Sequence, residues 1–132
     1  MNPTKKEILI TKDGVLLDIQ KTFTSFFPFL KLEFLRPDEL SKLSRSITID
    51  PNTSLKNFNN LNKPQKINID NNRTVLEVCN EFKNALGFLV EVSRKSGNVW
   101  NVISVTDGWT LENQNAAGAY ISSVMTVPTK TN

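Results

Sequence analysis

The chain of 132 residues contains no histidine and only one cysteine, Cys79. Without histidine it lacks the usual general base near neutral pH, the Ser-His and Cys-His nucleophile arrangements and the commonest zinc ligand. Cys79 lies between Val78 and Phe82 in a predicted helix and has no activating neighbour, so we expect a buried core thiol. We therefore expect a protein that is not an enzyme, with no catalytic, cofactor or metal site.

A single cysteine cannot form an intrachain disulfide, and a lone thiol agrees with a reducing compartment. Long apolar runs are also absent, because Ile8-Leu9-Ile10 is followed at once by Thr11-Lys12-Asp13. We expect neither a signal peptide nor a transmembrane span, and we expect the protein to be cytoplasmic.

The chain contains no run of five like charges. Its 16 basic and 13 acidic residues are dispersed and give a net charge of +3. Such a balance favours solubility over any named partner, whereas specific nucleic-acid binders normally concentrate their positive charge on one face or helix.

Two stretches, 7–36 and 66–94, have the pattern of the same strand-helix-strand unit. Ile8 and Ile10 alternate with polar neighbours, as Ile67 and Ile69 do after a shift of 59 positions. An apolar stripe with helical spacing follows in each unit: Leu16, Ile19, Phe23 and Phe27 in the first, Val75, Val78, Phe82 and Leu86 in the second. Gene duplication explains this repeat, and so does the independent demand of two helices packing on one sheet.

The ends of the two helices carry recognisable signals. Thr74 and Glu77 form a capping box at the start of the second helix, whereas Asp13-Gly14 marks the first start more weakly. Pro28 and Gly87 predict the two helix ends, because proline cannot continue a helix and glycine tolerates a left-handed C-cap. An alternating strand follows each helix. In the repeat pattern, Leu30, Leu32 and Phe34 of the first unit match Val90 and Val92 of the second, after a slip of one residue.

We therefore predict a single α+β domain over 1–132 with a ferredoxin-like sandwich fold. Its two strand-helix-strand units would place both helices on one face of a mainly antiparallel sheet. A linker over 37–64 joins the units, with a short strand at Ile47 and Ile49. A helical turn is expected from Leu55, Phe58 and Leu61.

The segment 98–127 supplies an extra strand and a C-terminal helical segment. Lys95-Ser96-Gly97-Asn98 predicts a hairpin turn in which Gly97 adopts positive φ, and an added strand follows over Val99 to Val105. A short helix then begins with Asp107 or Thr110 as its N-cap. Beyond Gly118 the apolar residues show no clean period: Tyr120, Ile121, Val124, Met125 and Val127.

Two polar groupings have a chemical interpretation beside a structural one. Asp107 and Glu112 would suit acid/base work or a divalent cation, but N-capping and helix-dipole placement explain them more simply. Arg94-Lys95-Ser96-Gly97 would present cations and backbone N–H groups to a phosphate. It is not a P-loop, because the second glycine and the Gly-Lys-Ser/Thr ending are missing, so we favour a solvated hairpin tip.

The segment 74–118 resembles a family of small uncharacterised bacterial proteins with an Arg-Lys-Ser-Gly hairpin, a tryptophan strand and a Thr-Asp-x-Trp-Thr-Leu-x-x-Gln-Asn turn. The matching residues are Phe82, Gly87, Arg94, Lys95, Ser96, Gly97, Trp100, Thr106, Asp107, Trp109, Thr110, Leu111, Gln114 and Asn115. The resemblance implies that this segment folds as one unit, and it implies no activity, cofactor or residue role.

We expect a non-enzymatic protein-interaction or structural module, such as a small subunit of a larger cytoplasmic bacterial assembly or a self-associating protein. The candidate partner-binding residues are Trp100, Trp109, Tyr120, Ile121, Val124, Arg94 and Lys95. The alternative is a nucleic-acid-associated domain that contacts phosphates through Lys31, Arg94 and Lys95 on a mildly basic sheet face and hairpin. Neither 29–36 nor 98–105 matches the basic-aromatic strand of an RNA-recognition domain.

Overall fold

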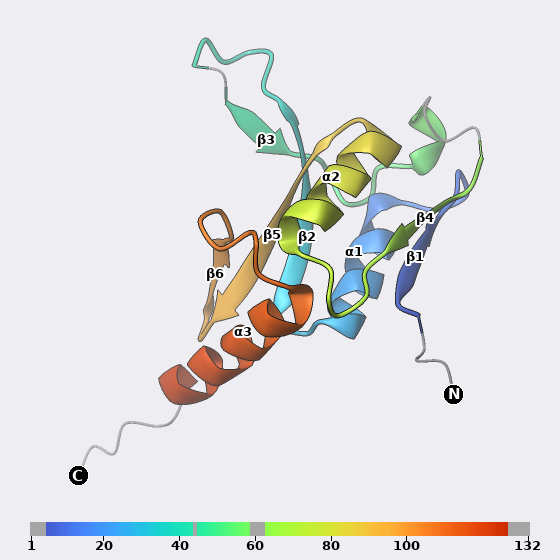
Figure 1. Cartoon of the computed structure of the whole chain (residues 1–132). Coiled ribbons are helices and arrows are strands. Elements are labelled where there is room, and N and C mark those ends of the chain that lie inside the picture. Colours follow the sequence, from blue (N-terminus) through green and yellow to red (C-terminus); the bar gives the residue numbers. More distant parts are fainter. Residues whose placement is uncertain (1–4, 44, 59–62, 127–132) are drawn as a thin grey trace.

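The computed structural model describes residues 5–43, 45–58 and 63–126 (Figure 1). Helices and antiparallel strands alternate along the chain, which confirms the α+β class. The elements are β1 (Glu7–Ile10), α1 (Leu16–Phe26), β2 (Leu30–Pro37), β3 (Ser46–Thr48), the 3-10 turn η1 (Leu55–Asn57), β4 (Gln65–Asn68), α2 (Val75–Leu86), β5 (Leu89–Ser96), β6 (Val99–Val102) and α3 (Leu111–Thr126).

The strands divide between two sheets, so a single ferredoxin-like sheet is not confirmed. The strands after the helices form the antiparallel centre of a four-stranded sheet with the order β3-β2-β5-β6, which is curled like half a barrel. The strands before the helices, β1 and β4, pair only with each other, and Ile8 lies opposite Ile67. A ferredoxin-like fold would have inserted β1 and β4 into the larger sheet.

One hydrophobic core joins both halves. Phe23 of α1 and Phe82 of α2 are fully buried members of the same cluster. The ring of Phe82 contacts the ring of Phe34 edge-on, with 5.9 Å between the ring centres. Alternate residues of β2 point into this core, and β5 adds Val92, while the isoleucines of β1 and β4 close it from the other side. We call the helix-covered face of the four-stranded sheet the inner face and the opposite one the outer face.

The two halves repeat each other beyond the predicted units. At the start of α1, the Leu16 N–H donates to the Thr53 carbonyl and the Leu55 N–H donates to the Gly14 carbonyl. At the start of α2, the Val75 N–H donates to the Trp109 carbonyl and the Leu111 N–H to the Arg73 carbonyl in the same pattern. Each helix start is therefore bonded to a second turn, and η1 is the short counterpart of the beginning of α3.

Most predicted boundaries of the repeat are confirmed. The Thr74 hydroxyl accepts from the Glu77 N–H, and the Glu77 carboxylate accepts from the Thr74 N–H. Gly87 caps α2 with φ of 79°, and α1 ends at Phe26, before Pro28. Gly97 has φ of 68° in the hairpin turn.

The linker and the C-terminal segment differ in part from their predictions. The strand β3 includes Ile47, but Ile49 lies just beyond it and is buried. The added strand β6 ends at Val102 instead of Val105, and the predicted short helix continues past Gly118 as α3. Leu61 and Val127 lie outside the described residues. In the part of the chain that the structure describes, no helix combines the length and apolar character needed to cross a membrane.

Candidate functional site

The outer face of the sheet carries an aromatic residue between two lysines. Trp100 of β6 lies opposite Lys95 of β5, and the Lys31 and Lys95 ammonium groups lie 5.0 and 6.0 Å from the centre of its ring. Trp100 is therefore on the helix-free outer face, while Ile103, three residues later, packs against the core. These lysines already make cation–π contacts with the ring.

Two glutamates share the centre of the outer face. Glu33 of β2 and Glu91 of β5 are direct cross-strand partners. Burial, together with the negative charge of Glu33, raises the pKa of Glu91 above the usual glutamate range. The Lys31 ammonium lies 3.6 Å from the Glu33 carboxylate and offsets part of this repulsion. Carboxylates at the centre of this face would repel nucleic-acid phosphates.

The raised pKa of Glu91 predicts a pH-dependent effect of Glu91→Gln. Because the folded-state pKa exceeds the unfolded one, the contribution of Glu91 to folding falls as pH rises from the unfolded-state pKa through the folded-state pKa. Glu91→Gln removes this pH-dependent loss of stability. The free energy of unfolding of the variant, relative to that of the native chain, should therefore be higher at neutral pH than at acidic pH. Urea unfolding at both pH values measures this difference, with the exposed loop substitution Glu39→Gln as control. An equal difference at both pH values would contradict the expected linkage.

Arg94 does not lie with Lys31 and Lys95. It is the cross-strand partner of Leu30, and its side chain runs over the inner face beneath α3. The Arg94 Nη1 donates to the Gln114 Oε1 at 2.9 Å. The cations proposed as phosphate contacts are therefore divided between the two faces of the sheet.

Gln114 holds this arginine in place. It is fully buried in α3, and its Nε2 donates to the Thr106 carbonyl at 2.7 Å and to the Thr106 Oγ1 at 2.9 Å. Sequence reasoning did not select Gln114 as a site residue. The sequence signal that could have found it is the helical spacing of Leu111, Gln114, Gly118 and Ser122. These residues form the buried side of α3, and most of them are small or polar.

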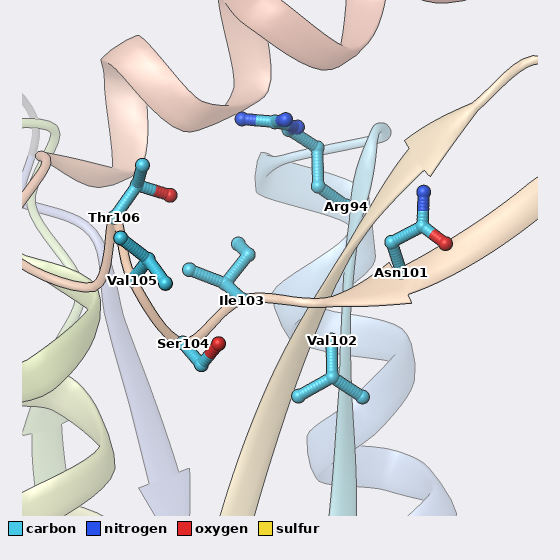
Figure 2. A pocket seen from close by; sticks show the side chains of 7 residues that line it. All are labelled: Arg94, Asn101, Val102, Ile103, Ser104, Val105 and Thr106. Atoms are coloured by element: carbon cyan, nitrogen blue, oxygen red, sulfur yellow. The ribbon is translucent and has the colours of Figure 1, made fainter.

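A pocket of about 240 Å³ opens beside Arg94. Figure 2 shows Arg94 and Asn101 rising from neighbouring strands, with Ile103 and Thr106 on the other side and Val102 pointing away. Ser104 and Val105 complete the lining from the loop after β6. Arg94 is the only charged residue among these lining residues of the described chain.

Two N–H groups of the hairpin are already hydrogen-bonded within the protein. The Gly97 N–H donates to the Ser122 hydroxyl of α3 at 3.1 Å, and the Lys95 N–H donates to the Phe29 carbonyl. Phe29 lies in the turn before β2, with its side chain against Gly118. The turn is therefore tied to α3 and β2 by its own backbone.

The remaining chemical candidates have structural roles. Burial, with smaller effects of Asp107 and Glu91, raises the pKa of Cys79 to about 11, so its thiol stays protonated near neutral pH. Thr110 provides the cap of α3, because its Oγ1 accepts from the Asn113 N–H, and Glu112 lies in the first turn. Within the described ranges, no three acidic, cysteine or histidine side chains gather as metal ligands.

The other predicted contact residues lie on or beside α3. Tyr120 and Val124 are 71% and 56% exposed one helical turn apart, and Met125, which was not selected, is 60% exposed. Ile121 is half-buried, and Trp109 is 48% exposed just before the helix. The predicted set therefore forms two separate surfaces, with Arg94 in neither.

Comparison of the chain with protein-family models, curated proteins and solved structures finds no match.

Proposed function

We propose that this chain is a non-enzymatic module that binds another protein through the exposed side of α3. The observation that carries the proposal is an uncharged apolar surface on a helix, which we call the α3 patch: Tyr120 and Val124. In the 16 residues of α3, Glu112 is the only charged side chain. Helices that face only water normally carry charged residues on their outer side.

The geometry of the patch favours a helix-in-groove contact. Tyr120 and Val124 are four residues apart and thus lie one above the other on the same side of the helix. Two or more apolar anchors with this spacing are what a hydrophobic groove on a partner recognises. A small subunit of a larger assembly would use α3 in this way, with the core of the domain as a rigid support.

The proposal predicts that Val124→Lys abolishes partner binding and that Asn72→Lys does not. Asn72 is exposed in the turn before α2, so the second variant adds the same charge outside the patch. The measurement is quantitative affinity capture from the native host with all three proteins, together with light scattering of the purified chain. A lysine in the apolar contact should reduce capture by at least about tenfold.

Each outcome has a defined meaning. A partner lost with Val124→Lys and kept with Asn72→Lys supports the α3 patch. Association of the purified native chain that Val124→Lys abolishes identifies a second copy as the occupant. A native chain that is strictly monomeric and captures the same proteins as Val124→Lys contradicts the proposal.

A further inference from the structure

Arg94 is a cation on an otherwise apolar surface. On the inner face of the two central strands its neighbours include Leu30, Val92 and Leu32, all of which are buried. Arg94 is half-buried, and withdrawing a guanidinium from water is costly unless its donors are paired, most effectively with a carboxylate. Among the described residues, Arg94 has no ion pair with an acid.

Among the described residues, one nitrogen of the Arg94 guanidinium is buried without a partner. Gln114 accepts from Nη1, whereas Nε is buried and has no hydrogen-bond partner in the described chain. Nε itself is enclosed by the protein, so a carboxylate in the pocket that Arg94 lines would accept a charge-assisted hydrogen bond from the terminal nitrogens. A half-buried guanidinium without a carboxylate partner among the described residues requires an explanation, and a bound carboxylate supplies one.

The fold itself does not require polar residues here. Three residues after Leu111, α3 presents Gln114, whereas three residues after Leu55, the equivalent place in the first half carries Phe58. Phe58 packs its ring against Phe88 at 4.6 Å between ring centres, in an apolar contact. The second half therefore has Gln114 where the first half has an apolar contact, and Gln114 orients an arginine whose Nε has no partner among the described residues.

The geometry points to a carboxylate-binding site in the Arg94 pocket. The lining carries one positive charge, which matches one carboxylate, whereas a phosphate normally requires more than one cation or a nest of free N–H groups. Asn101, Ser104 and Thr106 add polar groups, and Ile103 and Val105 supply an apolar wall for a short aliphatic stem.

The size of the pocket limits the ligand. Its volume of about 240 Å³ lies below the roughly 300–1,000 Å³ of typical cofactor and drug sites. It therefore suits a short-chain carboxylic acid or the carboxylate end of a peptide, both of which present the same group to Arg94.

The test uses the full chain and observes the Arg94 Nε–H resonance by NMR during titration with glutarate. We expect a saturable shift of this resonance that an equal ionic strength of sodium chloride does not produce. The resonance is assigned by its loss in Arg94→Lys, which keeps the charge but loses the planar fork and should weaken glutarate binding by about tenfold or more. Lys95→Gln, which removes the neighbouring cation on the outer face, should leave binding within about twofold of the native chain.

Further titrations separate the two sources of the carboxylate. A short peptide with a free C-terminus that binds more tightly than glutarate, and loses this advantage when amidated, assigns the site to a protein ligand. Glutarate binding that exceeds peptide binding assigns it to a small acid. No shift of the Nε–H resonance with any carboxylate, or inorganic phosphate binding more tightly than all of them, overturns the inference. If Arg94→Lys fails to fold, the resonance is assigned in the native chain by its through-bond connectivity to the Arg94 backbone, and the native-chain titration decides.

Discussion

Phe82→Ala is expected to lower the free energy of unfolding by about 3–5 kcal/mol. Phe82 is fully buried, touches the ring of Phe34 and belongs to the cluster that both halves share. Because small domains are stable by only about 5–15 kcal/mol, this variant should lie close to its unfolding threshold. Urea unfolding followed by circular dichroism measures the loss.

Phe23→Ala and Phe26→Ala provide the matched comparison. Phe23 is fully buried on α1, so Phe23→Ala should lower the free energy of unfolding as much as Phe82→Ala does. Phe26 is 36% exposed on the same helix, so Phe26→Ala should lower it by about 1 kcal/mol or less. All three variants should unfold in one transition, because there is one core. Two separate transitions, or equal losses for Phe26→Ala and Phe82→Ala, would contradict that arrangement.

Gly118→Ala is expected to destabilise the protein by about 1–3 kcal/mol, although alanine normally favours a helix interior. A Cβ at this position would lie 2.8 Å from the Phe29 Cβ and 3.1 Å from the Arg94 Cγ, so α3 must move away from the strands. The variant should weaken the Arg94–Gln114 hydrogen bond as well. Urea unfolding gives the stability, and amide hydrogen exchange in α3 reports its detachment.

Gly108→Ala is the control for this substitution. A Cβ on Gly108 would meet nothing within 4 Å, so the stability should change by no more than about 0.5 kcal/mol. If Gly118→Ala proved more stable than the native chain, the close approach of α3 to Phe29 would be wrong.

The elements were predictable from the sequence wherever local chemistry determines them. The Thr74–Glu77 capping box, the left-handed Gly87 and the Gly97 turn are properties of a few adjacent residues, and all three are present. The pairing of β5 with β6 follows from the predicted hairpin, but the pairing of β1 with β4 was not predictable. Alternation tells which side of β1 or β4 is buried, but not which strand lies beside it, and here these two strands pair with each other.

The full length of α3 was missed for a different reason. Its buried side carries Gln114, Gly118 and Ser122 after Leu111, so hydrophobic periodicity is weak although the helix packs closely. The face of the sheet on which Arg94 lies, in contrast, could have been predicted from the sequence. It follows Val90 and Val92 in steps of two, which assigns it to the inner face, yet its charge suggested an exposed residue.

The reciprocal bonding of the helix starts explains why Val15 can precede α1 without a capping side chain. A valine there offers no acceptor, but main-chain carbonyls of Pro51 and Thr53 take up the first amide protons of the helix. Side chains at this junction are consequently free to drift during evolution without loosening the helix. Homologues of this protein would then keep the paired turns in three dimensions while losing any recognisable signature for them in their amino acids.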